Sequence, residues 1–185
     1  MSPTQHFGAA PHIDTKDMLL AREFDLSVSP RPEGAALPPP RVVVAGGSMG
    51  GCCAAIALRA AGCEVCDVYE RTPGELPSQG AGLVIQPDIA AFLEHYSVCR
   101  VEDVAVRSSG RQYVDRRGAV IGGNDAPQLF SAWDVLHRAL RAKVPQHHYH
   151  GGCAVRGVEA AGGGVALLLA GGGRVEADLL IGADG

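Results

Sequence analysis

Short apolar runs separated by glycine define the ordered part of this chain. The run 42–45, Val-Val-Val-Ala, is continuous and β-branched, which is typical of a strand buried on both faces. It leads into the glycine-rich turn 46–51, and the Ala- and Leu-rich segment 52–61 predicts a helix that ends at Gly62. A second strand is predicted over 64–69. This order predicts a right-handed βαβ unit with parallel strands.

Downstream of this unit the pattern predicts shorter elements. An irregular loop over 74–82 is followed by a helix over 87–96, because proline is tolerated in the first turn of a helix. The segments 111–115 and 119–122 flank Arg-Arg-Gly, which predicts a hairpin.

A second long helix is expected from Ser131, a candidate N-cap, because the residues that follow have helical apolar spacing. Three further strands are predicted over 155–159, 165–169 and 175–181, separated by triple-glycine turns. The whole pattern predicts a mixed α/β architecture in which a β-rich insertion lies beside the parallel sheet.

Residues 1–40 show no sustained hydrophobic periodicity. They end in Leu37-Pro38-Pro39-Pro40, a run that behaves as a stiff spacer. We therefore expect 1–40 to be a disordered or weakly ordered tail. This segment lacks the basic and apolar regions of a secretory signal, and it carries several acidic residues, which transit peptides avoid. The predicted location is cytoplasmic.

Composition argues against several functional classes. A net charge of −4 without a basic stripe disfavours nucleic acid or anionic membrane as partners. No apolar run approaches the roughly 20 residues of a membrane span. The six cysteines do not form a framework of the secreted type, so we expect reduced thiols. No serine is accompanied by a base and an orienting acid, so no nucleophilic triad is predicted.

Two clusters contain residue types found in redox sites and metal sites, but a structural interpretation is favoured for both. Cys63-Glu64-Val65-Cys66 has the spacing of a redox dithiol, yet it straddles a helix-to-strand turn, and no helix N-terminus follows to lower a thiol pKa. His147, His148 and His150 could bind a metal, but a zinc site needs further ligands in a fixed geometry. We predict a solvated loop there and no metal site.

The turn 46–51 carries the strongest local signal for ligand binding. In a dinucleotide fingerprint the first glycine makes the tight turn, the second allows close approach to a pyrophosphate, and the third allows helix–strand packing. Gly46 and Gly51 fill the first and third places, and Ser48 stands at the second. The helix N-terminus would offer phosphates unpaired N–H groups and a favourable dipole. The alternative is a plain turn in a glycine-rich chain.

Glu70 ends the second predicted strand, where a carboxylate accepts hydrogen bonds from an adenosine ribose. An acidic residue here suits a ribose with a free 2′-hydroxyl, as in FAD or NAD. Arg71 follows and is a candidate for lying along the nucleotide. The alternative for both residues is a solvated charge.

Four segments in this order resemble the single-component (group A) FAD-dependent aromatic-ring monooxygenases, the para-hydroxybenzoate hydroxylase-like class. They are the strand-turn-helix 42–61, Val68-Tyr69-Glu70-Arg71, the segment 80–87 and the segment 181–185. The Gly-Gly-Ser turn and 80–87 are most similar to the dihydroxypyridine hydroxylase-like branch. The resemblance implies a Rossmann-like βαβ FAD-binding fold with a β-rich insertion, truncated before its C-terminal half. Residues 41–185 would then be the N-terminal part of the FAD-binding domain with the start of the substrate-domain insertion.

The resemblance also implies roles for individual residues. Glu70 would hold the adenosine ribose, with Arg71 beside it, and Asp184 would serve both FAD and the reduced nicotinamide donor. The positions that would surround the FAD pyrophosphate are Gly46, Gly47, Ser48, Met49 and Gly51. The positions that match a backbone loop running past the flavin are Gly80, Ala81, Gly82 and Leu83. The alternatives are a plain connection for this loop and a strand-end cap for Asp184.

The chain departs from the family pattern at two points. Trp133 stands where many relatives have an Arg or Gln that contacts FAD. The second flavin motif of the family, a Gly-Asp pair contacting the ribityl chain, is expected beyond Gly185.

The implied complete enzyme binds FAD, accepts hydride from NADPH or NADH, and uses O₂ to hydroxylate an aromatic or heteroaromatic ring. Its partner is a small aromatic substrate, and we expect this chain alone to be inactive. All the named residues bind cofactor, so no catalytic side chain is assigned. The alternatives are a flavin-binding module without turnover, from a degenerate or truncated product, and another FAD-dependent oxidoreductase on the same fold.

Overall fold

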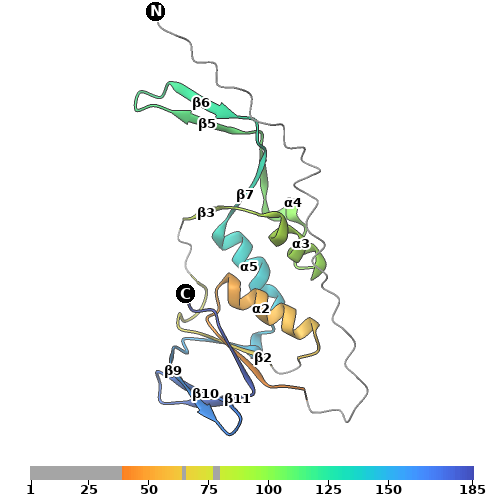
Figure 1. Cartoon of the computed structure of the whole chain (residues 1–185), viewed down its shortest axis with the longest axis vertical. Coiled ribbons are helices and arrows are strands. Elements are labelled where there is room, and N and C mark those ends of the chain that lie inside the picture. Colours follow the sequence, from red (N-terminus) through yellow and green to blue (C-terminus); the bar gives the residue numbers. More distant parts are fainter. Residues whose placement is uncertain (1–38, 64–65, 77–79) are drawn as a thin grey trace, which may run out of the picture.

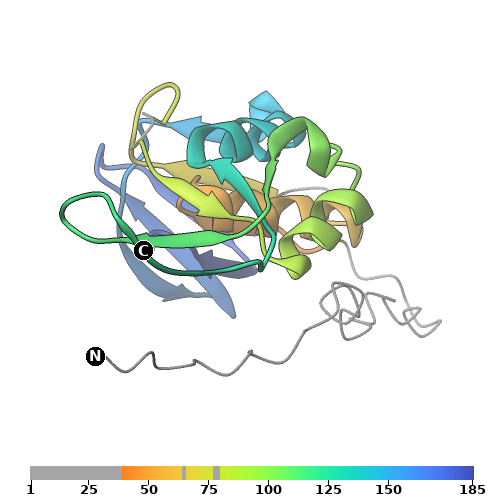
Figure 2. The ribbon, with the colours of Figure 1, turned by 90° about the horizontal axis from the view of Figure 1, so that it is seen from above.

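A computed structural model describes residues 39–63, 66–76 and 80–185. Most of the predicted tail, the first two residues of the predicted second strand and part of the predicted loop 74–82 lie outside the described residues. The described part is built around one parallel sheet, with helices on one face and an antiparallel sheet on the other (Figures 1 and 2).

The parallel sheet has four strands in the order β12-β1-β2-β8, and each neighbouring pair runs parallel. Its strands are β1 (Val42–Ala45), β2 (Cys66–Glu70), β8 (Tyr149–Gly151) and β12 (Leu179–Gly182). All four residues of β1 are buried, as the continuous β-branched run predicts. Helix α2 (Met49–Ala60) joins β1 to β2, so the predicted strand-turn-helix-strand order is confirmed.

The two faces of this sheet make two separate cores, because successive side chains of a strand point to opposite faces. Val44 and Val68 pack with α2 and with α5 (Trp133–Lys143), whose Leu136 and Leu140 are buried. Val43 and Tyr69 pack on the other face with Leu167. That face is covered by the antiparallel strands β9 (Val155–Ala161), β10 (Gly164–Leu169) and β11 (Arg174–Ala177).

The predicted single strand over 175–181 is two strands in different sheets, so this prediction was wrong. β11 belongs to the antiparallel sheet and β12 to the parallel sheet. Asp178 lies between them, and its backbone N–H donates to the Arg41 carbonyl at 2.9 Å. Its Oδ2 accepts from the Arg41 N–H at 2.7 Å. These two hydrogen bonds hold residue 178 beside the start of β1, at the point where the chain passes from the antiparallel sheet to the parallel sheet.

A third sheet and a hairpin form the insertion between β2 and α5. The hairpin over 111–122 and the helix over 87–96 are confirmed, and the sheet was not predicted. The sheet has the antiparallel order β3-β7-β4, with β3 (Gly82–Val84), β7 (Gln128–Ala132) and β4 (Val106–Ser108). The helices are α3 (Pro87–His95) and α4 (Val101–Val104). The hairpin strands β5 (Arg111–Val114) and β6 (Val120–Asn124) project away from the body (Figure 1).

Ser131 is not the N-cap of α5. It is a buried residue of β7, and its Oγ donates to the Val104 carbonyl at 2.6 Å. The hydroxyl therefore ties β7 to the end of α4. The helix begins at Trp133, with Ala132 at the N-cap.

The histidine cluster is not a solvated loop. It forms the 3₁₀ turn η1 (Gln146–His148) and the start of β8. His148 Nδ1 and His150 Nε2 lie 2.9 and 3.2 Å from Asp67 Oδ1, so both rings fasten β8 to the neighbouring strand. In the described ranges no group of three or more His, Cys, Asp or Glu is arranged to hold a metal.

The cysteine pair 63 and 66 has no dithiol character in this fold. Burial raises the pKa of the Cys66 thiol to about 11, which is the opposite of the shift a reactive thiolate needs. No disulfide links cysteines within the described residues. Across the same part of the chain, no helix has the length and apolar character needed to cross a membrane.

Candidate cofactor site

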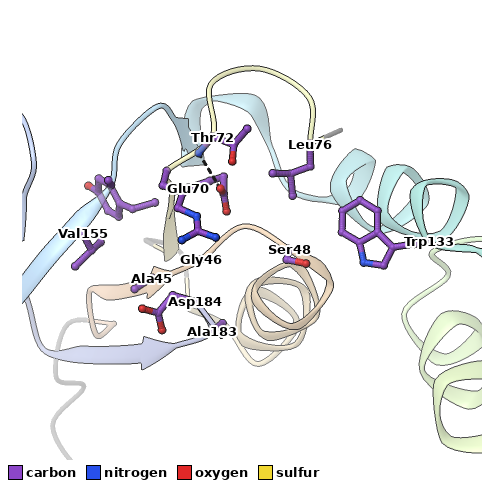
Figure 3. Close-up of a pocket in the computed structure, with 13 residues that line it drawn as sticks. Ala45, Gly46, Ser48, Glu70, Thr72, Leu76, Trp133, Val155, Ala183 and Asp184 are labelled. Atoms are coloured by element: carbon purple, nitrogen blue, oxygen red, sulfur yellow. Dashed lines mark hydrogen bonds between the residues drawn. The ribbon is translucent and has the colours of Figure 1, made fainter. Parts of the chain in front are cut away.

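A pocket of about 310 Å³ opens at the carboxyl edge of the parallel sheet (Figure 3). Open α/β sheets bind ligands at this edge, because the strand-to-helix turns present backbone groups there. The walls of the pocket come from the ends of β1, β2 and β12, from the loop after β2, and from the starts of α2, α5 and β9. The lining of the pocket includes Gly46, Ser48, Glu70, Trp133 and Asp184.

The turn after β1 requires glycine at its first and third fingerprint positions. Gly46 has a φ of +106°, and a Cβ there would lie 2.3 Å from the Ala183 carbonyl oxygen. A Cβ on Gly51 would lie 1.8 Å from the Gly46 carbonyl oxygen. These are the tight-turn and close-packing requirements of the first and third fingerprint glycines.

Ser48 starts helix α2 as its N-cap. Its backbone is extended, its side chain makes no capping hydrogen bond, and the first turn of the helix carries no acidic residue. In Figure 3 it lies between Gly46 and Trp133 at the pocket. The positive end of the helix is therefore open to an anion on this side.

Glu70 is buried against the turn and is not a solvated charge. Its Oε2 accepts from the Gly47 N–H at 2.8 Å, and its Oε1 accepts from the Thr72 N–H at 2.8 Å. Burial by itself would raise the pKa of this carboxyl, but the hydrogen bonds from Thr72 and Gly47 together with the positive charge of Arg71 outweigh it, and the net pKa is lowered. Each carboxylate oxygen accepts more than one hydrogen bond, so capacity remains for a ligand.

The structure brings five of the predicted residues to the pocket wall and places the others elsewhere. The lining residues are Gly46, Ser48, Glu70, Arg71 and Asp184. Gly47 is buried behind the turn, Met49 packs against the helix-side core, and Gly51 packs on Gly46.

The predicted flavin loop lies beside the start of α5. Within the described residues, Gly80 to Leu83 are not part of the lining of this pocket. The Ala81 carbonyl accepts from the Trp133 N–H at 3.0 Å, and Gly82 and Leu83 pair with Ala132 and Ser131. Gly80 has a φ of +64°, which favours glycine.

Sequence reasoning missed two buried residues that contact the turn. His137 Nε2 lies 3.0 Å and the Tyr149 hydroxyl 3.1 Å from the Gly47 carbonyl oxygen. They lie 90 and 102 residues from Gly47 along the chain, so only the fold brings them together. Thr72 was also missed, although its position two residues after Glu70 is the local spacing of a side chain that accepts from a nearby backbone N–H.

Comparison with known proteins agrees with this geometry. No protein-family model matches the chain. The 2,6-dihydroxypyridine 3-monooxygenase of Paenarthrobacter nicotinovorans is 35% identical over 133 residues, which are 71% of this chain and 33% of that enzyme. The solved 2,6-dihydroxypyridine-3-hydroxylase of Arthrobacter nicotinovorans has a TM-score of 0.74 at 32% identity, over 81% of this chain and 38% of that chain. This chain is homologous to the FAD-dependent monooxygenases.

The resemblance to the dihydroxypyridine hydroxylase-like branch is thereby confirmed. HpxO of Klebsiella pneumoniae, solved with FAD and uric acid, shares the fold with a TM-score of 0.66 at 24% identity, over 78% of this chain and 39% of that chain. The matched part of this chain spans about a third of the length of the Paenarthrobacter enzyme.

Proposed function

We propose that this chain supplies the ADP-binding half of an FAD site, in a Rossmann-like fold, within an aromatic-ring monooxygenase. The observation that carries the proposal is the buried Glu70 carboxylate held against the glycine turn at the carboxyl edge of the sheet. A parallel βαβ unit that ends in this pair is the arrangement that binds an adenosine ribose and a diphosphate together.

The residues present fit this half of the cofactor. Gly46 and Gly51 leave no room for a Cβ, and the first turn of α2 carries no acidic side chain to repel phosphates. Ser48 and the backbone of the turn would hold the diphosphate, and Glu70 would accept hydrogen bonds from the ribose hydroxyls. Arg71 and Asp184, both exposed at the pocket rim, would flank the cofactor.

The remaining predicted cofactor contacts belong to the flavin half. Family likeness supports a role for the backbone of 80–83, and its attachment to the start of α5 holds that segment in place. When bound, FAD supplies the redox and oxygen chemistry, with NADPH or NADH as the electron donor. The described residues bind and orient the cofactor, and we assign none of them a catalytic role.

The substrate class we propose is an electron-rich aromatic or heteroaromatic ring. The support is the pyridine substrate in the name of one homologue. The chain spans about a third of that enzyme, so we propose that the 185 residues alone bind nucleotide without oxidising NADPH. A flavin-binding module without turnover is the second candidate, because the described residues are assigned to cofactor binding and none of them to catalysis. Cytoplasmic location stays a prediction.

Titration of the purified chain with ADP and with FAD, followed by calorimetry, tests the proposal. We expect Glu70→Ala to raise the Kd for ADP at least about tenfold, which corresponds to roughly 1.4 kcal/mol. Glu94→Ala, at an exposed position of α3, is the matched control and should bind ADP like the parent chain. Equal ADP affinity in all three proteins would overturn the assignment.

Flavin content and NAD(P)H oxidation of a form as long as the relatives distinguish the two candidate functions. We expect it to purify yellow and to oxidise NADPH or NADH in the presence of an aromatic substrate. A yellow protein without turnover would favour the binding module, and a colourless one would contradict both.

A further inference from the structure

The peptide that joins Gly47 to Ser48 is held by buried side chains on its carbonyl side. The Gly47 carbonyl oxygen lies 3.0 Å from His137 Nε2, 3.1 Å from the Tyr149 hydroxyl and 3.4 Å from Cys52 Sγ. A carbonyl oxygen only accepts hydrogen bonds, so His137 must carry its hydrogen on Nε2. Three side chains from three elements thus converge on one backbone oxygen.

Tyr149 and Cys52 keep their protons in the folded chain. Burial raises the pKa of the Tyr149 hydroxyl to about 12, and burial raises the pKa of the Cys52 thiol to about 12 as well. His137 is itself buried, and its ring stacks on Trp133 with centroids 4.8 Å apart and planes 12° apart. The stack fixes the direction in which Nε2 points.

The direction of this carbonyl decides the direction of the next N–H. A trans peptide is planar, so its C=O and N–H point in opposite directions, and the described residues contain no cis peptide. With the Gly47 oxygen directed at His137 and Tyr149, the Ser48 N–H points away from them. Ser48 itself belongs to the pocket lining, and His137 and Tyr149 do not.

A flipped peptide would reverse this arrangement. The carbonyl oxygen would then face the pocket, where its partial negative charge repels a diphosphate, and the Ser48 N–H would be lost to the ligand. A flip of this peptide rotates ψ of Gly47 and φ of Ser48. Glycine tolerates the first rotation. Ser48 would have to leave its φ of −73° for the positive region that a residue with a Cβ rarely adopts, so its backbone resists the flip together with the side-chain hydrogen bonds. The absence of a Cβ is nevertheless required, since a Cβ on Gly47 would lie 2.3 Å from the Tyr149 hydroxyl.

We propose that His137, assisted by Tyr149, is a positioning residue that sets the Gly47–Ser48 peptide for diphosphate binding before the cofactor arrives. This inference rests on the proposed function, because the ligand it prepares for is the diphosphate of a dinucleotide. The expected gain is preorganisation: the turn has one orientation in the free protein, so binding does not have to order it.

The test compares His137→Gln with His137→Leu in the 185-residue chain. Glutamine keeps an N–H donor at a reach close to that of Nε2, and leucine does not. Both changes remove the ring stack on Trp133, the single tryptophan of the chain, so its emission spectrum should shift alike in the two variants. Any difference between them in ADP binding therefore reports the hydrogen bond.

We expect His137→Leu to raise the Kd for ADP about tenfold and His137→Gln to stay within about twofold of the parent chain. Tyr149→Phe should weaken ADP binding less than His137→Leu, and the double variant should lose more than either. Melting temperatures of the Gln and Leu variants should agree closely. If the Leu variant does not fold, His137→Asn replaces it, because asparagine is polar but too short to reach the carbonyl.

The outcomes separate this inference from the proposed function. If the parent chain binds ADP and the donor-keeping and donor-lacking variants bind it equally, His137 does not position the peptide, and only this inference fails. If the parent chain does not bind ADP, the proposed function fails and takes this inference with it.

Discussion

Two adjacent glycines of α2 show how strictly single positions are determined in the turn. A Cβ on Gly51 would meet the Gly46 carbonyl oxygen at 1.8 Å, whereas a Cβ on Gly50 would meet nothing within 4 Å. Gly51→Ala should therefore destabilise the chain by about 1–3 kcal/mol through overpacking. Gly50→Ala should be neutral or stabilise it by about 0.4–1 kcal/mol, because alanine restricts the unfolded chain. Urea unfolding without ligand measures both, and equal effects would contradict the packing.

At the residue scale, the sequence could predict those residues whose positions follow from the geometry of a short segment. Gly46, Gly51 and Glu70 were identified because a tight turn and a strand-end carboxylate have fixed spacing. His137 and Tyr149 could not be identified in the same way. Their contact with Gly47 depends on how α5 and β8 pack against α2 and β2, and no short-range pattern encodes that packing.

Edge strand β8 depends on one carboxylate of its neighbour β2. Burial by itself would raise the pKa of Asp67, but hydrogen bonds from His148 and His150 outweigh it and lower the pKa. A lowered carboxyl pKa stabilises the fold above the ordinary value of 3.8 and loses that contribution as pH falls through the folded-state pKa. The stability of the β2–β8 pair should therefore fall below about pH 4.

Asp67→Asn tests this pH dependence. At pH 5 the variant should lose about 1.5–3 kcal/mol of unfolding free energy, the range for hydrogen bonds to charged groups. Between about pH 5 and pH 3 its stability should fall less steeply than that of the parent chain, because the titrating group is gone. Asp125→Asn, at an exposed position, is the control. Parallel pH profiles for the Asp67 variant and the parent chain would contradict the assignment.

At the element scale, helices and strands with a clear hydrophobic pattern were predicted, and the shortest strands were not. β1, α2, α3 and the hairpin follow from apolar runs, capping glycine and turn residues. β3 and β4 have three residues each, too few for a period, and they exist because β7 lies between them. The division of 175–181 at Asp178 was missed because the apolar pattern continues across it, while the partner Arg41 lies far away in the sequence.

At the scale of the whole molecule, the projecting hairpin carries apolar side chains that do not belong to the described core. The hairpin β5–β6 exposes Tyr113, Val114, Val120 and Ile121, each more than half exposed. Val120→Thr with Ile121→Thr should therefore change the unfolding free energy by no more than about 0.5 kcal/mol. The variant should also stay monodisperse at higher concentration, because less apolar surface is available for association. Urea unfolding and analytical sedimentation check the two expectations, and a large loss of stability would show that the hairpin packs on the core.

The position of β12 beside β1 sets the time at which the turn after β1 can first reach its final surroundings. Arg41 and Asp178 are separated by 137 residues, and the Ala183 carbonyl closes over Gly46 only when β12 has joined the sheet. At translation rates of about 5–20 residues per second, the ribosome needs roughly 7–27 s to make the intervening segment. During that interval one side of β1 has no partner strand. If the turn binds a diphosphate as proposed, its site can therefore be complete only after residue 183 has been synthesised and has joined the sheet.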